Sequence, residues 1–137
     1  MRPINRIIVH HSASPREATT RHMIEEWHRA NGWKGIGYHW VIEGDGLRYA
    51  TRSMEIAGAH ARGANHDSIG ICTVGNNCEP DERWTPQQED TLRALIGELL
   101  SRFGPLDIIG HRDVPGAKTL CPGIDVRNWW NVDSSKP

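Results

Sequence analysis

The sequence contains few cysteines, and their number limits the kinds of fold that it can specify. Only three occur in 137 residues, at Cys72, Cys78 and Cys121. An odd number cannot pair completely within one chain, and three are too few for the disulfide framework of a small secreted domain. We expect reduced thiols, although the spacing of Cys72 and Cys78 would allow one bridge. Cys72 lies in an apolar run, where a small core residue is expected.

The sequence also lacks an excess of either charge and any long apolar segment. It has 16 Lys and Arg against 17 Asp and Glu, so it has no basic field of the kind that nucleic-acid binding normally requires. No run approaches the roughly 20 apolar residues of a membrane-spanning helix. The first six residues lead directly into a short apolar run, without the longer apolar region and cleavage site of a secretory signal. We therefore expect synthesis in the cytoplasm without a signal peptide, no nucleic-acid partner and no membrane insertion.

Signals for strands and helices alternate along the chain, which has the length of one domain and contains no repeat. The clearest helix is expected over 85–103, where Thr85 suits the N-cap and Gln88 completes a capping box. This alternation predicts an α/β fold, a single domain whose mixed sheet is flanked by helices. The other elements are expected as strands at 7–12, 68–74 and 106–109, helices at 19–31 and 125–130, a hairpin over 38–49 and a polar C-terminal tail at 131–137.

Three residues that are far apart in the sequence could bind one metal ion. His10 follows an apolar run, His111 follows a second one, and Cys121 comes ten positions later. Two imidazoles and a thiolate are typical zinc ligands, and three protein ligands leave a fourth position open, as in catalytic zinc sites. Neighbouring side chains on a strand point to opposite faces, so only one of His10 and His11 is expected to ligate.

Seven short motifs, spread from about residue 7 to residue 130, carry a resemblance to a known family. They are Val9-His10-His11-Ser12, Gly37-Tyr38-His39-Trp40, Gly58-Ala59-His60, Asn65 with Ser68-Ile69-Gly70, Val74-Gly75-Asn76, Gly110-His111-Arg112-Asp113 and Cys121-Pro122-Gly123. In their order and spacing they resemble the zinc-dependent N-acetylmuramoyl-L-alanine amidases. This superfamily includes phage lysozymes of the T-seven type and the peptidoglycan recognition proteins. The resemblance implies a central sheet of about five strands flanked by helices, with a metal at the floor of a groove.

The resemblance also implies which residues hold the metal. The family pattern selects His10 rather than His11, and His111 and Cys121 complete the set. One Zn²⁺ per chain is the expected cofactor. Two neutral imidazoles and one thiolate leave this ion with a single net positive charge, and a bound water completes the tetrahedron.

Three residues are candidates for assisting the reaction. Attack on an amide builds negative charge on the carbonyl oxygen, and the leaving amine needs a proton. Tyr38 matches a tyrosine of the phage relatives, although strand alternation would place Trp40 and Ile42 on the same side of the sheet. Those relatives have a lysine two residues before the cysteine ligand. Here that position is Thr119, as in catalytic peptidoglycan recognition proteins, and Lys118 precedes it. We favour Thr119 as the helper and keep Lys118 as the alternative.

Two further residues occupy positions that line the substrate groove in the family. His60 and Asn65 are therefore expected to contact the glycan or the stem peptide of the substrate. The alternative is that Asn65, together with Gly58 and Gly63, supplies turn conformations to an irregular loop.

The resemblance predicts a zinc amidase catalytic domain over 1–130. Its expected reaction is hydrolysis of the bond between the lactyl group of N-acetylmuramic acid and L-alanine of peptidoglycan. We expect a monomeric phage or prophage endolysin that reaches periplasmic peptidoglycan after holin-type permeabilisation. Alternatives are a non-lytic peptidoglycan-binding protein, an enzyme that recycles muropeptides, and, by analogy with the T-seven relative, a contact with RNA polymerase.

Overall fold

The fold is built on one mixed sheet of five strands. The computed structural model describes residues 1–79 and 82–134. In the sheet the strands are ordered β3-β2-β4-β1-β5, and all neighbours are parallel except β2 and β3. The strands are β1 (Arg6–His11), β2 (Trp40–Ile42), β3 (Arg48–Ala50), β4 (Ser68–Thr73) and β5 (Asp107–Gly110). The helices are α1 (Arg21–Ala30), α2 (Pro86–Phe103) and α3 (Val126–Ser134), with short 3₁₀ turns η1 (Asn65–Asp67) and η2 (His111–Asp113). The predicted α/β class and the hairpin are confirmed.

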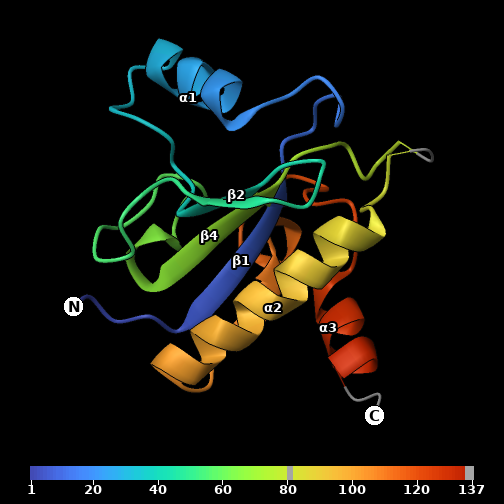
Figure 1. Cartoon of the computed structure of the whole chain (residues 1–137). Coiled ribbons are helices and arrows are strands. Elements are labelled where there is room, and N and C mark those ends of the chain that lie inside the picture. Colours follow the sequence, from blue (N-terminus) through green and yellow to red (C-terminus); the bar gives the residue numbers. More distant parts are fainter. Residues whose placement is uncertain (80–81, 135–137) are drawn as a thin grey trace.

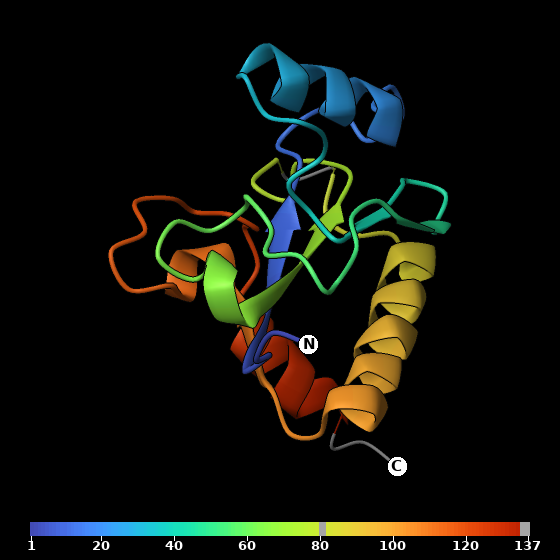
Figure 2. The same cartoon turned by 90° about the vertical axis from the view of Figure 1, so that its left-hand side faces the viewer.

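The two faces of the sheet are covered in different ways. Helices α2 and α3 pack on one face (Figure 1), where the largest apolar cluster forms. Helix α1 stands apart from both of them, beyond the ends of β1 and β4 (Figure 2). The face opposite α2 and α3 is covered by loops and by the inner side of α1, which form two smaller apolar clusters. This opposite face carries the candidate site.

Strand β1 divides its side chains between these two faces. Ile7 and Val9 belong to the cluster under α2 and α3, whereas Ile8 belongs to a cluster on the other face. Because side chains alternate along a strand, His10 is delivered to the same face as Ile8. Its strand lies between β4 and β5, and the side chain is 1% exposed.

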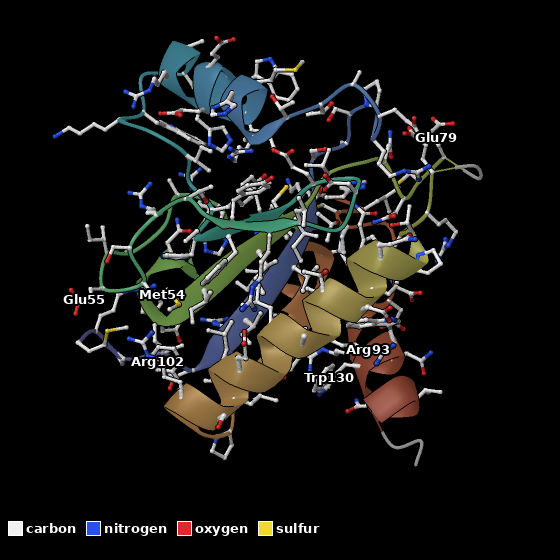
Figure 3. The ribbon with its side chains drawn as sticks, viewed as in Figure 1. Met54, Glu55, Glu79, Arg93, Arg102 and Trp130 are labelled. Carbon is white, nitrogen blue, oxygen red and sulfur yellow. The ribbon has the colours of Figure 1, made fainter. Side chains whose placement is uncertain are left out.

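Helix α2 forms as the sequence predicts. The Thr85 hydroxyl accepts a hydrogen bond from the backbone N–H of Gln88, and the Gln88 side chain accepts one from the N–H of Thr85. Helix α2 lies beside α3. The Arg93 guanidinium of α2 is 4.3 Å from the centre of the Trp129 ring of α3. Figure 3 labels Arg93 on α2 and Trp130 on α3, at the side where these helices adjoin. The buried stripe of α2 consists of Leu92, Leu95, Ile96 and Leu99.

Two helices differ from their predicted form. Helix α3 continues through Ser134, beyond Trp129, the last aromatic residue that it buries. It therefore enters the segment expected as a tail, of which residues 135–137 lie outside the described part. Helix α1 packs against the rest of the domain through a narrow strip of its surface. It therefore buries Ile24 alone and leaves Trp27 41% exposed. No helix within residues 1–79 and 82–134 has the length and apolar character needed to cross a membrane.

Candidate metal centre

The three predicted metal ligands meet at the ends of parallel strands. His10 lies near the end of β1, His111 directly follows β5, and Cys121 lies in the loop before α3. One possible ligand atom from each residue can be chosen so that all three lie within 4.8 Å of one another. The Cys121 Sγ is 3.8 Å from the His10 Nδ1. In a tetrahedral zinc site, with Zn–N of about 2.0–2.1 Å and Zn–S of about 2.3 Å, these two atoms would be about 3.5 Å apart. The donor set and its spacing fit a zinc ion.

The surroundings of Cys121 suit a metal-bound thiolate. The backbone N–H of His11 donates a hydrogen bond to the Cys121 Sγ over 3.3 Å. In the absence of a cation, burial raises the pKa of this thiol to about 12, while the hydrogen bond from His11 lowers it. A metal must therefore displace a proton from Cys121 when it binds.

The two ligand imidazoles are held in their neutral forms. Burial, followed by the charges of His60, His111 and His11, lowers the pKa of His10 well below its usual value. Burial also lowers the pKa of His111. A neutral imidazole keeps a lone pair on one ring nitrogen, which is what a metal ligand requires.

His11 lies outside this group. Its Nδ1 accepts a hydrogen bond from the backbone N–H of Asn77, whose side-chain amide donates to the carbonyl of Pro122. His11 thus supports the loop that carries Cys121 from the other side of β1, as expected from strand alternation.

The loops that carry His111 and Cys121 are tied together by their backbones. The N–H of Arg112 donates to the carbonyl of Cys121 over 2.7 Å. The Asp113 carboxylate accepts a hydrogen bond from the N–H of Gly110 and so closes the η2 turn. A Cβ at Gly110 would lie 2.7 Å from Pro122, so glycine is what allows these loops to approach.

Tyr38 lies next to the metal ligands. Its ring centre is 5.0 Å from that of His10. Strand β2 begins only at Trp40, so the alternation of strand side chains does not apply to Tyr38. Tyr38 can therefore face the candidate site without Trp40 and Ile42 lying on the same side of the sheet. Burial, followed by the nearby thiols of Cys72 and Cys121, raises the pKa of the Tyr38 phenol well above its usual value. Tyr38 therefore keeps its proton and can act as a hydrogen-bond donor.

Thr119 and Lys118 lie in the loop between His111 and Cys121. The Thr119 hydroxyl accepts a hydrogen bond from the backbone N–H of Cys121 over 3.1 Å. Both residues line an open cavity of about 590 Å³ that also includes His111 and Arg62. Thr119 is thus bonded to the ligand loop, whereas the Lys118 side chain is exposed.

Comparison with known proteins identifies the family. A family model described as N-acetylmuramoyl-L-alanine amidase matches residues 1–124. The chain belongs to this family. The endolysin of Escherichia phage T7 is 38% identical over 128 residues, covering 90% of this chain and 83% of the relative. Peptidoglycan-recognition protein SC2 of Drosophila melanogaster is 33% identical over 138 residues, covering 90% of this chain and 73% of the relative.

A solved structure agrees with the fold and with the family. N-acetylmuramoyl-L-alanine amidase LysC from Clostridium intestinale URNW superimposes with a TM-score of 0.85 and 35% identity, covering 97% of this chain and 87% of that chain. The protein is an N-acetylmuramoyl-L-alanine amidase that acts on peptidoglycan and is related to phage endolysins. The resemblance seen in the sequence and the fold that it implied are both confirmed.

The two predicted substrate residues of the amidase are engaged within the protein. The Asn65 Oδ1 accepts hydrogen bonds from the backbone N–H groups of His60 and Ala61, each 2.9 Å long. These bonds give Asn65 a part in holding the loop, and its expected contact with substrate stays a prediction. The His60 ring lies edge-on to His10, and its Nδ1 is 2.8 Å from the His10 Nε2.

His28 is a residue of the amidase site that sequence reasoning missed. Its ring lies 5.4 Å from Tyr38 and 4.6 Å from Trp33, and its Nδ1 accepts a hydrogen bond from the N–H of Gly37. These rings continue the site outward from the metal ligands to Trp33, which is 41% exposed. The sequence signal that could have identified His28 is its position one helical turn after Ile24, on the side of α1 that faces the rest of the domain.

Proposed function

We propose that the amidase depends on Zn²⁺ held by His10, His111 and Cys121. We propose further that it cleaves the bond between the lactyl group of N-acetylmuramic acid and L-alanine. The observation that carries the proposal is the convergence of two neutral imidazoles and one thiol in a single site. When bound, zinc polarises an amide carbonyl and lowers the pKa of a coordinated water toward about 7.

The roles of the neighbouring side chains follow from their protonation and bonding. The Tyr38 hydroxyl keeps its proton and donates a hydrogen bond to the carbonyl oxygen as negative charge develops there. The Thr119 hydroxyl accepts from the backbone of Cys121, which leaves its own proton free to point at a water or an oxyanion in the adjoining cavity. Lys118 is the alternative donor, because it lines the same cavity.

We place this activity in an endolysin, which degrades the wall of a host cell from within. Two phage endolysins, from Enterobacteria phage T3 and Escherichia phage T7, are each 38% identical to the chain. All three proposed ligands come from one chain, so the metal site needs no second subunit, and we propose a monomer as the working unit.

The test combines metal analysis with digestion of purified peptidoglycan sacculi. We expect about one zinc per chain and release of stem peptides that stops when a chelator removes the metal. Cys121→Ser should lose both zinc and activity. Cys78→Ser is the matched control, because Cys78 is an exposed thiol outside the proposed ligand set, and it should retain both.

Two outcomes would contradict the proposal. Undiminished digestion by Cys121→Ser would exclude the metal mechanism. Hydrolysis of soluble muropeptides without any attack on sacculi would indicate a recycling enzyme instead of an endolysin.

A further inference from the structure

His60 contacts the metal ligand His10 through an imidazole–imidazole hydrogen bond. We propose that His60 is a positioning residue, which holds His10 in the one tautomer and ring orientation that can bind the metal. This inference rests on the metal site proposed above.

Commitment of one His10 nitrogen to the metal determines where each proton lies. The His10 Nδ1 faces Cys121, at 3.8 Å from its Sγ, so this nitrogen must offer its lone pair to the metal. The proton of His10 then lies on Nε2 and is donated to the His60 Nδ1 over 2.8 Å. The proton of His60 in turn lies on its Nε2, which is 3.3 Å from the Ser68 hydroxyl. With the metal bound, one chain of bonds from His10 to Ser68 is thus compatible with a single tautomer of each ring.

The backbone of two glycines lies close against the His60 ring and leaves no room for a side chain there. A Cβ at Gly70 would lie 2.6 Å from the Cγ of His60, and one at Gly58 would lie 2.5 Å from its Cδ2. Neither contact could be tolerated, so only glycine allows the ring to lie in this place. Asn65 anchors the backbone of His60 from the other side. The sequence motifs around Gly58, Asn65 and Gly70 thus serve to place one imidazole behind a metal ligand.

The positioning role accounts for more of the structure than a substrate contact does. Both ring nitrogens of His60 already have partners within the protein, so neither is free for a glycan or peptide. Metal-binding histidines commonly donate their second N–H to a carboxylate, a carbonyl or a water. An imidazole acceptor fixes the tautomer without adding the negative charge of a carboxylate. The ion would then keep the single positive charge left by its ligands, and with it the power to polarise a carbonyl.

The test measures zinc affinity by competition with a chelator and needs no substrate. His60→Leu removes the acceptor and should weaken zinc binding about 10–100-fold, as loss of such outer partners typically does. His60→Asn places an oxygen close to the position of Nδ1 and should stay within a few-fold of the wild type. His60→Gln has similar bulk but extends its amide beyond that position, so it should resemble the leucine variant. His66→Asn is the control, since this histidine is in the same loop and its side chain is 71% exposed.

A second readout uses the metal-free protein. Nitrogen-15 NMR of the imidazoles should place the His10 proton on Nε2 in the wild type and in His60→Asn, and should detect a mixture of tautomers in His60→Gln. Zinc affinity that is equal in all the His60 variants, with only KM changed, would overturn the positioning role in favour of a substrate contact. A wild-type protein that binds no zinc would overturn the metal site itself, which is a different result.

Discussion

At the scale of single residues, two neighbours in the loop before Cys121 offer the same chemistry in different settings. Thr119 is half-buried and bonded to the backbone of Cys121, whereas Lys118 is exposed in the same cavity. A group that donates to a developing charge is effective when its position is fixed beforehand. The bonded threonine meets that condition, and the exposed lysine does not.

We therefore expect Thr119→Ala to lower kcat about 100- to 1,000-fold while one zinc per chain remains bound, because one donor to the oxyanion is lost. Thr119→Ser retains the hydroxyl and should remain close to the wild type. Lys118→Ala should change kcat less than threefold. Steady-state kinetics with a soluble muropeptide, together with zinc analysis, checks all three. If instead Lys118→Ala abolishes turnover and Thr119→Ala does not, the helper is the lysine.

Sequence alone could suggest the proposed ligands but not the contacts behind them. His10, His111 and Cys121 follow from ligand chemistry and family motifs, and strand alternation separates His10 from His11. The setting of Tyr38 could not be predicted, because it depends on where β2 begins. The bond between His60 and His10 joins residues 50 positions apart, and no local pattern encodes such a contact.

At the scale of the elements, α2 was the easiest to predict because its start and its buried stripe are both local signals. Its cap also contributes to tertiary structure, which the sequence did not reveal. The Gln88 amide is 1% exposed and donates to the carbonyl of Val74 over 2.8 Å. The capping box thus fastens the helix to the segment that follows β4. Helix α1 was predicted with similar bounds, but its exposure could not be foreseen, because an apolar stripe does not reveal how closely a helix docks.

The cap gives a graded prediction for stability. Thr85→Ala should lower the free energy of unfolding by about 1 kcal/mol, the usual value of an N-cap. Gln88→Leu should lower it by about 2 kcal/mol, because the buried carbonyl of Val74 then lacks a donor. Gln87→Ala, at an exposed position of the same turn, is the control and should change it by less than about 0.5 kcal/mol. Urea unfolding monitored by circular dichroism measures each value. Equal effects of the Gln87 and Gln88 changes would contradict the tertiary role.

At the scale of the whole molecule, several histidines are buried as neutral rings. His39 is fully buried, where its Nδ1 accepts from the N–H of Gly70 and its Nε2 donates to the carbonyl of Ile56. Burial lowers the pKa of His39 to about 4, and the bond to Ile56 opposes this shift in part. Burial likewise lowers the pKa of His60 to about 3. The folded state therefore binds fewer protons than the unfolded chain in mild acid.

This difference predicts that the metal-free protein loses stability as the pH falls. Above pH of about 6.5 the His39 ring is neutral in both states, so its contribution to stability is fully present. Between that pH and about 4 only the unfolded chain takes up the proton. The free energy of unfolding therefore falls by up to about 3 kcal/mol through His39 alone. Urea unfolding at pH 7.0 and 4.5 should show a smaller loss for His39→Gln than for the wild type. An exposed-site control, His66→Gln, should lose as much as the wild type. A wild-type stability that does not change over this range would contradict the burial of neutral rings.

Two of the proposed ligands, His10 and Cys121, are 111 positions apart in the chain. While a ribosome is still synthesising the protein, Cys121 leaves the exit tunnel long after His10. A nascent chain that stops before this cysteine has neither the thiolate nor the loop that brings His111 to it. The proposed metal site can thus form only after the segment that carries Cys121 has been made, and a fragment that stops earlier cannot bind a metal with this ligand set.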